Sequence, residues 1–152
     1  EMLRSLVGSE MCIRDRCIMM ARGFFKTASM CSDNFNIVMP IDMQAPCVMN
    51  LIFACELGLK AILIREQGHS IFTHELWKLY CNLDENTQKE IESIYRKRGT
   101  RFTIEETLKK NNDAFREWRY SFERTTGLTI MITDVRSMWY SIDQYIRSYC
   151  VG

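Results

Sequence analysis

The hydrophobic pattern of this chain is dominated by one long apolar segment, residues 53–69. The segment predicts a helix that is apolar on nearly every side, with the charged pair Glu56 and Lys60 inside it. A helix without a polar face is buried among other elements. Gly68 can end this helix in a left-handed conformation, so we expect an inner helix over about Pro46–Gln67.

Helical spacing also governs the remaining apolar positions, and no stretch alternates for long between apolar and polar residues. The pattern predicts an all-α fold, a single up-and-down helical bundle of about five helices. Besides the inner helix, the expected helical ranges are Ile18–Cys31, His74–Cys81, Glu85–Arg98, Thr103 to about Glu123, and Thr133–Tyr149.

Local signals place three of the helix starts. Thr103 and Glu106 have the spacing of a capping box, in which each side chain accepts a hydrogen bond from the backbone of the other. Pro46 suits the first turn of the inner helix, after a long connection over Ser32–Ala45. Asp84 can cap the helix that follows it.

Residues 5–16 resemble a translated transposase-type sequencing adapter. The codons CTC GTG GGC TCG GAG ATG TGT ATA AGA GAC encode Leu6–Asp15 in order, and a chance match over that run is very improbable. We therefore expect residues 1–16 to be an artefact that does not pack specifically. Residues 17–152 are expected to form one helical domain.

Charge and cysteine content limit the partners, the metal sites and the cellular compartment that we expect for this protein. The net charge is +1, so the chain as a whole lacks the large positive charge that would attract nucleic acid or an anionic membrane. No uninterrupted apolar run is long enough to span a bilayer. The seven cysteines show no CxxC and no paired Cys/His spacing, which argues against a zinc site. We expect a cytoplasmic protein with reduced thiols, no membrane contact, no cofactor and no metal.

Two polar groups near the inner helix are candidates for function. Glu56 and Lys60 are four residues apart and share a helix face, so we interpret them as a structural ion pair at the bundle edge. Two charges on a buried helix need each other or a partner from another helix. His69 can stabilise the helix end, or it can transfer protons as a candidate catalytic residue.

A third group lies in the segment Phe115–Glu123, where two arginines share a stripe beside aromatic anchors. Arginine binds phosphate or carboxylate at two points, so both a structural and a binding role are open. The candidate ligand or RNA contacts are Lys60, Arg116 and Arg119. The candidate structural network is Glu56, Trp118 and Glu123. The structural interpretation predicts that Glu56 lies within ion-pair reach of Arg119 or Arg116.

The ordered series of these motifs resembles a HEPN-type domain over roughly residues 18–149. The residues that carry the resemblance are Glu56-Leu57-x-Leu59-Lys60-Ala61, Gly68-His69, Leu76 with Leu79, and Phe115-x-x-Trp118-Arg119-Tyr120-x-x-Glu123. The resemblance implies a small up-and-down α-bundle that pairs as a homodimer. Members of this family serve as toxins or defence ribonucleases, or accompany nucleotidyltransferase-like antitoxins.

The sequence departs from the family in one motif, and this departure limits which family properties can be expected of this chain. The ribonuclease branch has an Arg followed after four to six residues by His, and neither His69 nor His74 has an arginine at that offset. Catalysis is therefore not implied, and the leading hypothesis is a binding or interaction module of a prokaryotic toxin–antitoxin or defence system. Its ligand would be a protein partner, RNA or a nucleotide. The alternative is a metal-independent endoribonuclease that uses His69 with Arg116 or Arg119, and a purely structural subunit is a third reading.

Overall fold

The computed structural model describes residues 12–31, 41–113 and 132–150. These residues form six helices and no strand, which confirms the all-α prediction. The helices are α2 (Ile13–Met30), α3 (Ile41–Gln67), α4 (Leu76–Cys81), α5 (Glu85–Arg96), α6 (Ile104–Lys110) and α8 (Ile132–Cys150).

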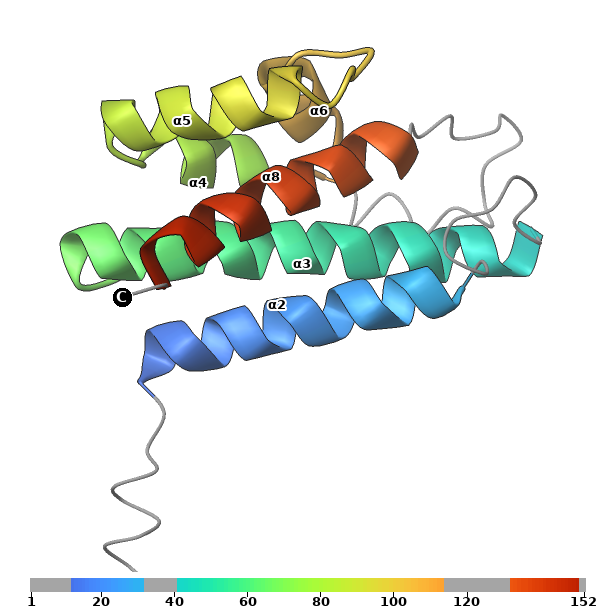
Figure 1. The fold of residues 1–152 in the computed structure, drawn as a ribbon. Coiled ribbons are helices and arrows are strands. Elements are labelled where there is room, and N and C mark those ends of the chain that lie inside the picture. The colour runs from blue at the N-terminus through green and yellow to red at the C-terminus, as the bar shows by residue number, and fades with distance from the viewer. Residues whose placement is uncertain (1–11, 32–40, 114–131, 151–152) are drawn as a thin grey trace, which may run out of the picture.

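The long helix α3 occupies the centre of the fold (Figure 1). Helix α2 runs antiparallel along one side of it, and α8 with the short α4 lies on the other side (Figure 1). Helix α5 packs on α8, and α6 contacts both α4 and α8. Residues over more than half of the circumference of α3 are consequently buried, among them Leu51, Cys55, Leu59, Ala61 and Leu63. This burial explains why the segment has almost no polar face.

A glycine permits the close approach of α3 and α8. A Cβ atom at Gly58 would lie 2.6 Å from Cγ2 of Ile142 and 3.2 Å from the ring of Trp139. Both neighbours are fully buried, so neither has room to move aside. The absence of a side chain at Gly58 therefore sets the distance between the two helices.

Helix α3 is also long and apolar enough, by length and composition alone, to cross a membrane over Asp42–Gln67. In this fold 67% of its most apolar 18-residue stretch is buried inside the protein. Burial inside the protein is thus sufficient to account for its apolar sequence.

Two predicted helix starts are too late. Helix α3 begins at Ile41 and not at Pro46, so the proline lies inside the helix and part of the predicted connection is helical. Pro46 is the sixth residue of α3, beyond the four amides that have no helical partner, so it removes one helical hydrogen bond, to the carbonyl of Asp42. Helix α2 begins at Ile13, within the segment interpreted as an artefact, and that residue is 62% exposed.

The predicted helix from Thr103 to about Glu123 is wrong in its length, because α6 ends at Lys110 and residues 111–113 form a turn. Asparagine side chains compete with the backbone for hydrogen bonds, and the Nδ2 of Asn111 donates to the carbonyl oxygen of Thr107 at 2.6 Å. The functional residues predicted beyond this turn lie outside the described residues: Arg116, Trp118, Arg119 and Glu123.

Three other local predictions are confirmed, whereas Asp84 stands directly before α5 but its side chain makes no capping hydrogen bond. Thr103 and Glu106 form the complete capping box, with the two backbone-to-side-chain bonds at 3.1 and 2.9 Å. Gly68 has a φ of +80°, as a left-handed helix stop requires. The last helix buries the predicted stripe of Val135, Met138, Trp139, Ile142 and Ile146.

Candidate functional site

The buried carboxylate of Glu56 is the centre of the candidate site. Glu56 is only 6% exposed, and the Nζ of Lys60 lies 2.7 Å from its Oε1. Both residues project from the same edge of α3 because they are four positions apart. The predicted ion pair is confirmed, and it provides the opposite charge that a buried carboxylate requires.

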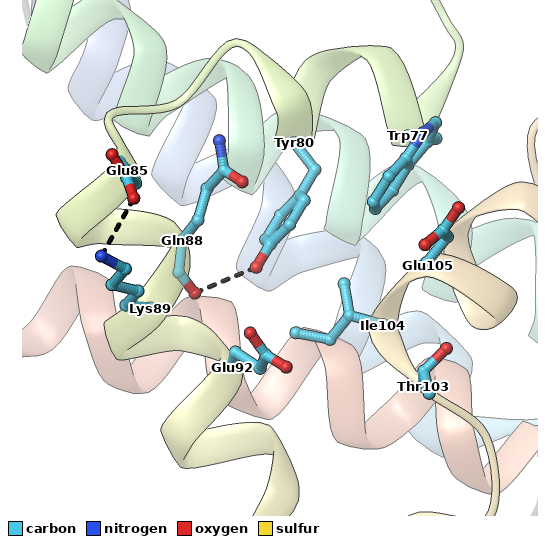
Figure 2. A pocket seen from close by; sticks show the side chains of 9 residues that line it. All are labelled: Trp77, Tyr80, Glu85, Gln88, Lys89, Glu92, Thr103, Ile104 and Glu105. Carbon is cyan, nitrogen blue, oxygen red and sulfur yellow. Dashed lines mark hydrogen bonds and ion pairs between the residues drawn. The ribbon is translucent and has the colours of Figure 1, made fainter.

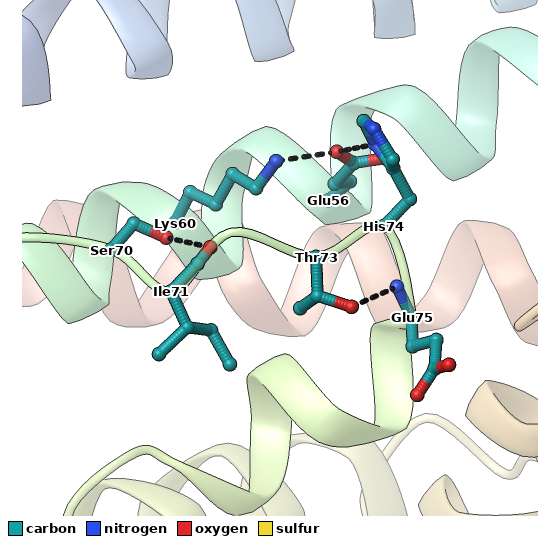
Figure 3. Close-up of polar contacts among 7 residues, drawn as sticks. All are labelled: Glu56, Lys60, Ser70, Ile71, Thr73, His74 and Glu75. Carbon is teal, nitrogen blue, oxygen red and sulfur yellow. Dashed lines mark hydrogen bonds and ion pairs between the residues drawn. The ribbon is translucent and has the colours of Figure 1, made fainter.

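A histidine from the next loop shares the same carboxylate oxygen. The Nδ1 of His74 lies 2.8 Å from Oε1 of Glu56 (Figure 3). An ionised carboxylate can only accept hydrogen bonds, so Nδ1 carries the proton and donates it. The other ring nitrogen, Nε2, makes no hydrogen bond with the described residues, and the side chain is 80% exposed.

The loop between α3 and α4 places His74 over Glu56. The chain reverses at Gly68, whose backbone N–H donates to the carbonyl of Ile64 at 2.9 Å. Just before α4, the hydroxyl of Thr73 accepts from the backbone N–H of Glu75 at 3.1 Å (Figure 3). These local bonds fix the last residues of the loop, and they thereby orient the imidazole.

A pocket of about 330 Å³ adjoins the Glu56–His74 pair. We call it the Glu56 pocket. Its described lining residues are Ile52, Phe53, Glu56, His74, Asn111 and Asn112. Its lining comes from α3, from the loop before α4 and from the turn that ends α6. An apolar cavity with a few converging polar groups is the usual form of a small-molecule site.

One of the lining residues, Asn111, carries a buried oxygen without a partner. The residue is 5% exposed, its Nδ2 donates to Thr107, and its Oδ1 has no hydrogen-bond partner among the described residues. An unpaired buried acceptor costs about 1–3 kcal/mol, so its retention calls for a reason. Asp134 Oδ2 is also unpartnered, but Asp134 stands in the first turn of α8, where the helix N-terminus stabilises negative charge.

The predicted site residues are only partly brought together. Lys60 and Glu56 meet as expected. His69 is exposed and makes no hydrogen bond or ion pair with the described residues, and its role stays a prediction. The histidine that contacts the carboxylate is His74. The proposed contact of Glu56 with Arg116 or Arg119 stays a prediction, since both arginines are outside the described ranges.

Sequence reasoning missed His74 and Asn111 as site residues. His74 is 18 positions from Glu56, and no local pattern links residues at that separation. The pair Asn111-Asn112 did carry a signal, because two consecutive asparagines are poor helix formers and favour a turn. That signal points to the end of α6, although it gives no indication of a pocket.

A second pocket of about 390 Å³ lies between α4, α5 and α6 (Figure 2), and we call it the Trp77 pocket. Its lining residues are Trp77, Tyr80, Glu85, Gln88, Lys89, Glu92, Thr103, Ile104 and Glu105. Two of them, Trp77 and Tyr80, stack with ring centroids 5.7 Å apart. Burial raises the pKa of Tyr80, so its hydroxyl stays protonated and donates to the carbonyl of Gln88 at 2.9 Å.

Comparisons of this chain with protein-family models, with curated proteins and with solved structures gave no match.

Proposed function

We propose that this chain is a HEPN-like binding module of a prokaryotic toxin–antitoxin or defence system, folded as a single up-and-down bundle. Its ligand contains a nucleotide and binds in the Glu56 pocket. The observation that carries the proposal is the combination of a buried carboxylate, an exposed imidazole and an unsatisfied amide oxygen around one mainly apolar cavity. The ordered motif series supports the family assignment.

The lining of the pocket suits the two parts of a nucleotide. Ile52 and Phe53 offer apolar contact to a flat base. His74 and Lys60 sit at the edge of the site, where a cationic or hydrogen-bonding group can contact a phosphate. The near-neutral net charge does not oppose this assignment, because a local cluster is sufficient for one phosphate contact.

Two histidine variants test the proposal. Fluorescence anisotropy with a labelled single-stranded RNA and with nucleoside monophosphates measures binding to the full chain. We expect His74→Ala to weaken binding at least about fivefold, the effect of losing one hydrogen bond to a charged group. The matched control is His69→Ala, in the same loop and exposed, which should bind like the unchanged chain. Binding of neither RNA nor nucleotide, or equal binding by both variants, contradicts the proposal.

The family resemblance adds partners to this proposal. We propose a cytoplasmic homodimer and a nucleotidyltransferase-like partner protein. Light scattering after size exclusion measures the oligomeric state, and a monomer at micromolar concentration contradicts the homodimer. A nucleotidyltransferase or defence gene beside the gene for this chain would favour the partner, and an unrelated metabolic operon would count against it.

A second candidate function, a metal-independent endoribonuclease, is favoured by one observation. Glu56 holds the Nδ1 of His74 and leaves Nε2 exposed, which is how a carboxylate orients an acid/base histidine. This version replaces His69 by His74 and keeps Arg116 or Arg119 as the proposed phosphate contact. Incubation with structured RNA should show cleavage that His74→Ala abolishes and His69→Ala retains. Equal cleavage by both variants, or none by the unchanged chain, contradicts it.

A further inference from the structure

We infer that the connection between α5 and α6 binds the phosphodiester backbone of a nucleic acid strand. We call residues 96–101 the basic turn, because they carry four cations: Arg96, Lys97, Arg98 and Arg101. A cavity beside this turn shares no described lining residue with the Glu56 pocket, so the two surfaces are separate. The inference goes beyond the proposed function, because it assigns a second surface whose ligand is a chain of phosphates.

The cations of this region differ in whether a carboxylate neutralises them. Within α5 and α6, three cations each pair with a glutamate four residues earlier in the same helix: Lys89, Arg96 and Lys109. Lys97, Arg98 and Arg101 are exposed as well, but they make no ion pair with the described residues. The same holds for Lys110 at the end of α6. These four cations are therefore available to an external anion.

The surrounding protein offsets only part of this charge. A helix C-terminus carries roughly half a negative charge, so the ends of α5 and α6 together offset about one positive charge. Asp134 offsets at most one more, and its Oδ1 already accepts a hydrogen bond from the backbone N–H of Arg101 at 3.2 Å. A surplus of about two positive charges remains at the surface.

Aromatic rings hold two of the four cations in place. The guanidinium carbon of Arg98 lies 4.5 Å from the centre of the Tyr140 ring on α8. The Nζ of Lys110 lies 3.6 Å from the ring centre of Phe102, the residue that follows Arg101, so the end of α6 adjoins the basic turn. A ring attracts a cation through its face but neutralises no charge, so both cations can still bind phosphate oxygens.

A cavity of about 220 Å³ lies beside the basic turn, and both Arg96 and Arg101 line it. Glu92 lines it too, but its Oε1 lies 2.6 Å from Nη2 of Arg96, so this pair is neutral. Arg101 is the cation that remains without a carboxylate there. Because a guanidinium binds phosphate at two points, the cavity suits one phosphate group of the strand.

A lipid surface fits the basic turn less well than a nucleic acid does. Surfaces that bind membranes combine basic residues with apolar side chains that enter the bilayer. The large exposed apolar side chains of the described residues lie elsewhere: Ile13, Met19, Met20 and Met30 on α2, and Phe72 in the loop before α4. Helix α2 lies on the side of α3 away from α5 and α8 (Figure 1). Contacts to a phosphodiester backbone need no apolar insertion.

Removal of two cations tests the inference. Fluorescence anisotropy of the full chain measures Kd at several salt concentrations, with a labelled single-stranded RNA and with DNA of the same length and sequence. Lys97→Ala/Arg101→Ala should weaken both at least about tenfold at about 0.1 M salt. The slope of log Kd against log salt should fall by about 1.4, since each phosphate contact with a single strand contributes about 0.7.

The matched control removes the same charge from another face. Arg16→Ala/Lys26→Ala replaces two exposed cations of α2, and it should leave the affinity and the slope unchanged. All four replaced side chains are exposed, so both variants should unfold at the temperature of the unchanged chain. Equal affinities and slopes for the two variants overturn the inference, and so does the absence of binding to both RNA and DNA.

Vesicles provide the test of the other polyanionic surface. Co-sedimentation with vesicles of phosphatidylserine and phosphatidylcholine should show no binding that depends on Lys97 and Arg101. Vesicle binding that Lys97→Ala/Arg101→Ala abolishes, together with unchanged affinity for RNA and DNA, assigns the basic turn to a membrane and contradicts the inference.

The outcomes also separate this inference from the proposed function. A nucleoside monophosphate carries a single phosphate, so its affinity should depend on His74 and not on Lys97 or Arg101. RNA binding that depends on the basic turn but not on His74 contradicts the proposed function alone. Binding that depends on His74, with no effect of Lys97→Ala/Arg101→Ala on RNA, contradicts this inference alone.

Discussion

The Glu56 pocket and the Trp77 pocket have similar size and opposite polar character. The Trp77 pocket is rimmed by carboxylates that each pair with a cation four residues along their own helix: Glu85 with Lys89, Glu92 with Arg96, and Glu105 with Lys109. These side chains are 44–82% exposed. The Glu56 pocket is instead lined by Glu56, which is 6% exposed, and by Asn111, whose amide oxygen has no partner among the described residues.

The difference shows which polar groups indicate a ligand. Exposed pairs four residues apart on a helix are weak and common, so they need no functional reason. A buried polar group without a partner lowers stability, and a folded chain retains few of them. Of the two pockets, the smaller one is therefore the better candidate for a binding site, although the larger one carries more charges.

The largest difference in the free energy of unfolding should come from replacing the lysine that pairs with a carboxylate of each pocket. Lys60→Ala leaves the buried carboxylate of Glu56 with His74 as its one charged or hydrogen-bonding partner among the described residues, and we expect a loss of about 2–3 kcal/mol in the free energy of unfolding. Lys89→Ala is the matched change in the Trp77 pocket and should cost less than about 0.5 kcal/mol. Urea denaturation measures both. Equal losses would mean that Glu56 is better solvated than its burial indicates.

The next two variants should differ in the direction in which they change the free energy of unfolding. Tyr80→Phe removes the donor to the carbonyl of Gln88 and should lower the free energy of unfolding by about 1 kcal/mol. Asn111→Leu removes an oxygen that has no partner among the described residues, and the gain offsets the lost bond to Thr107, so stability should be unchanged or slightly higher. Thermal and urea unfolding of both variants check the comparison. A loss above about 2 kcal/mol for Asn111→Leu would show that its oxygen is satisfied in solution.

The smallest expected effect is the dependence of the two ion-pair coupling energies on salt concentration. A double-mutant cycle on Glu85 and Lys89 should give a coupling of about 0.3–0.5 kcal/mol that disappears in 1 M salt, because exposed charges are screened. The corresponding cycle on Glu56 and Lys60 should keep most of its coupling, since the carboxylate is buried. Urea unfolding at low and high salt measures both cycles. A coupling that vanishes with salt in both pairs would remove the electrostatic difference between the two pockets.

Residues close together in the sequence determined much of the fold without the structure. The capping box of Thr103 and Glu106, the left-handed stop at Gly68 and the pair of Glu56 with Lys60 are all confirmed. Each depends on residues no more than four positions apart, whose geometry is fixed as soon as the helix forms. The apolar stripe of α8 was predictable for the same reason, because helical periodicity alone sets which residues share a face.

Only the tertiary structure decided what surrounds those residues. It brings His74 to Glu56 across a loop, and it places Asn111 from the end of α6 in the same pocket. These contacts depend on the angles and distances between packed helices, which no local pattern encodes. The start of α3 before Pro46 belongs to the same class, because packing decides how far a helix continues through residues of weak propensity.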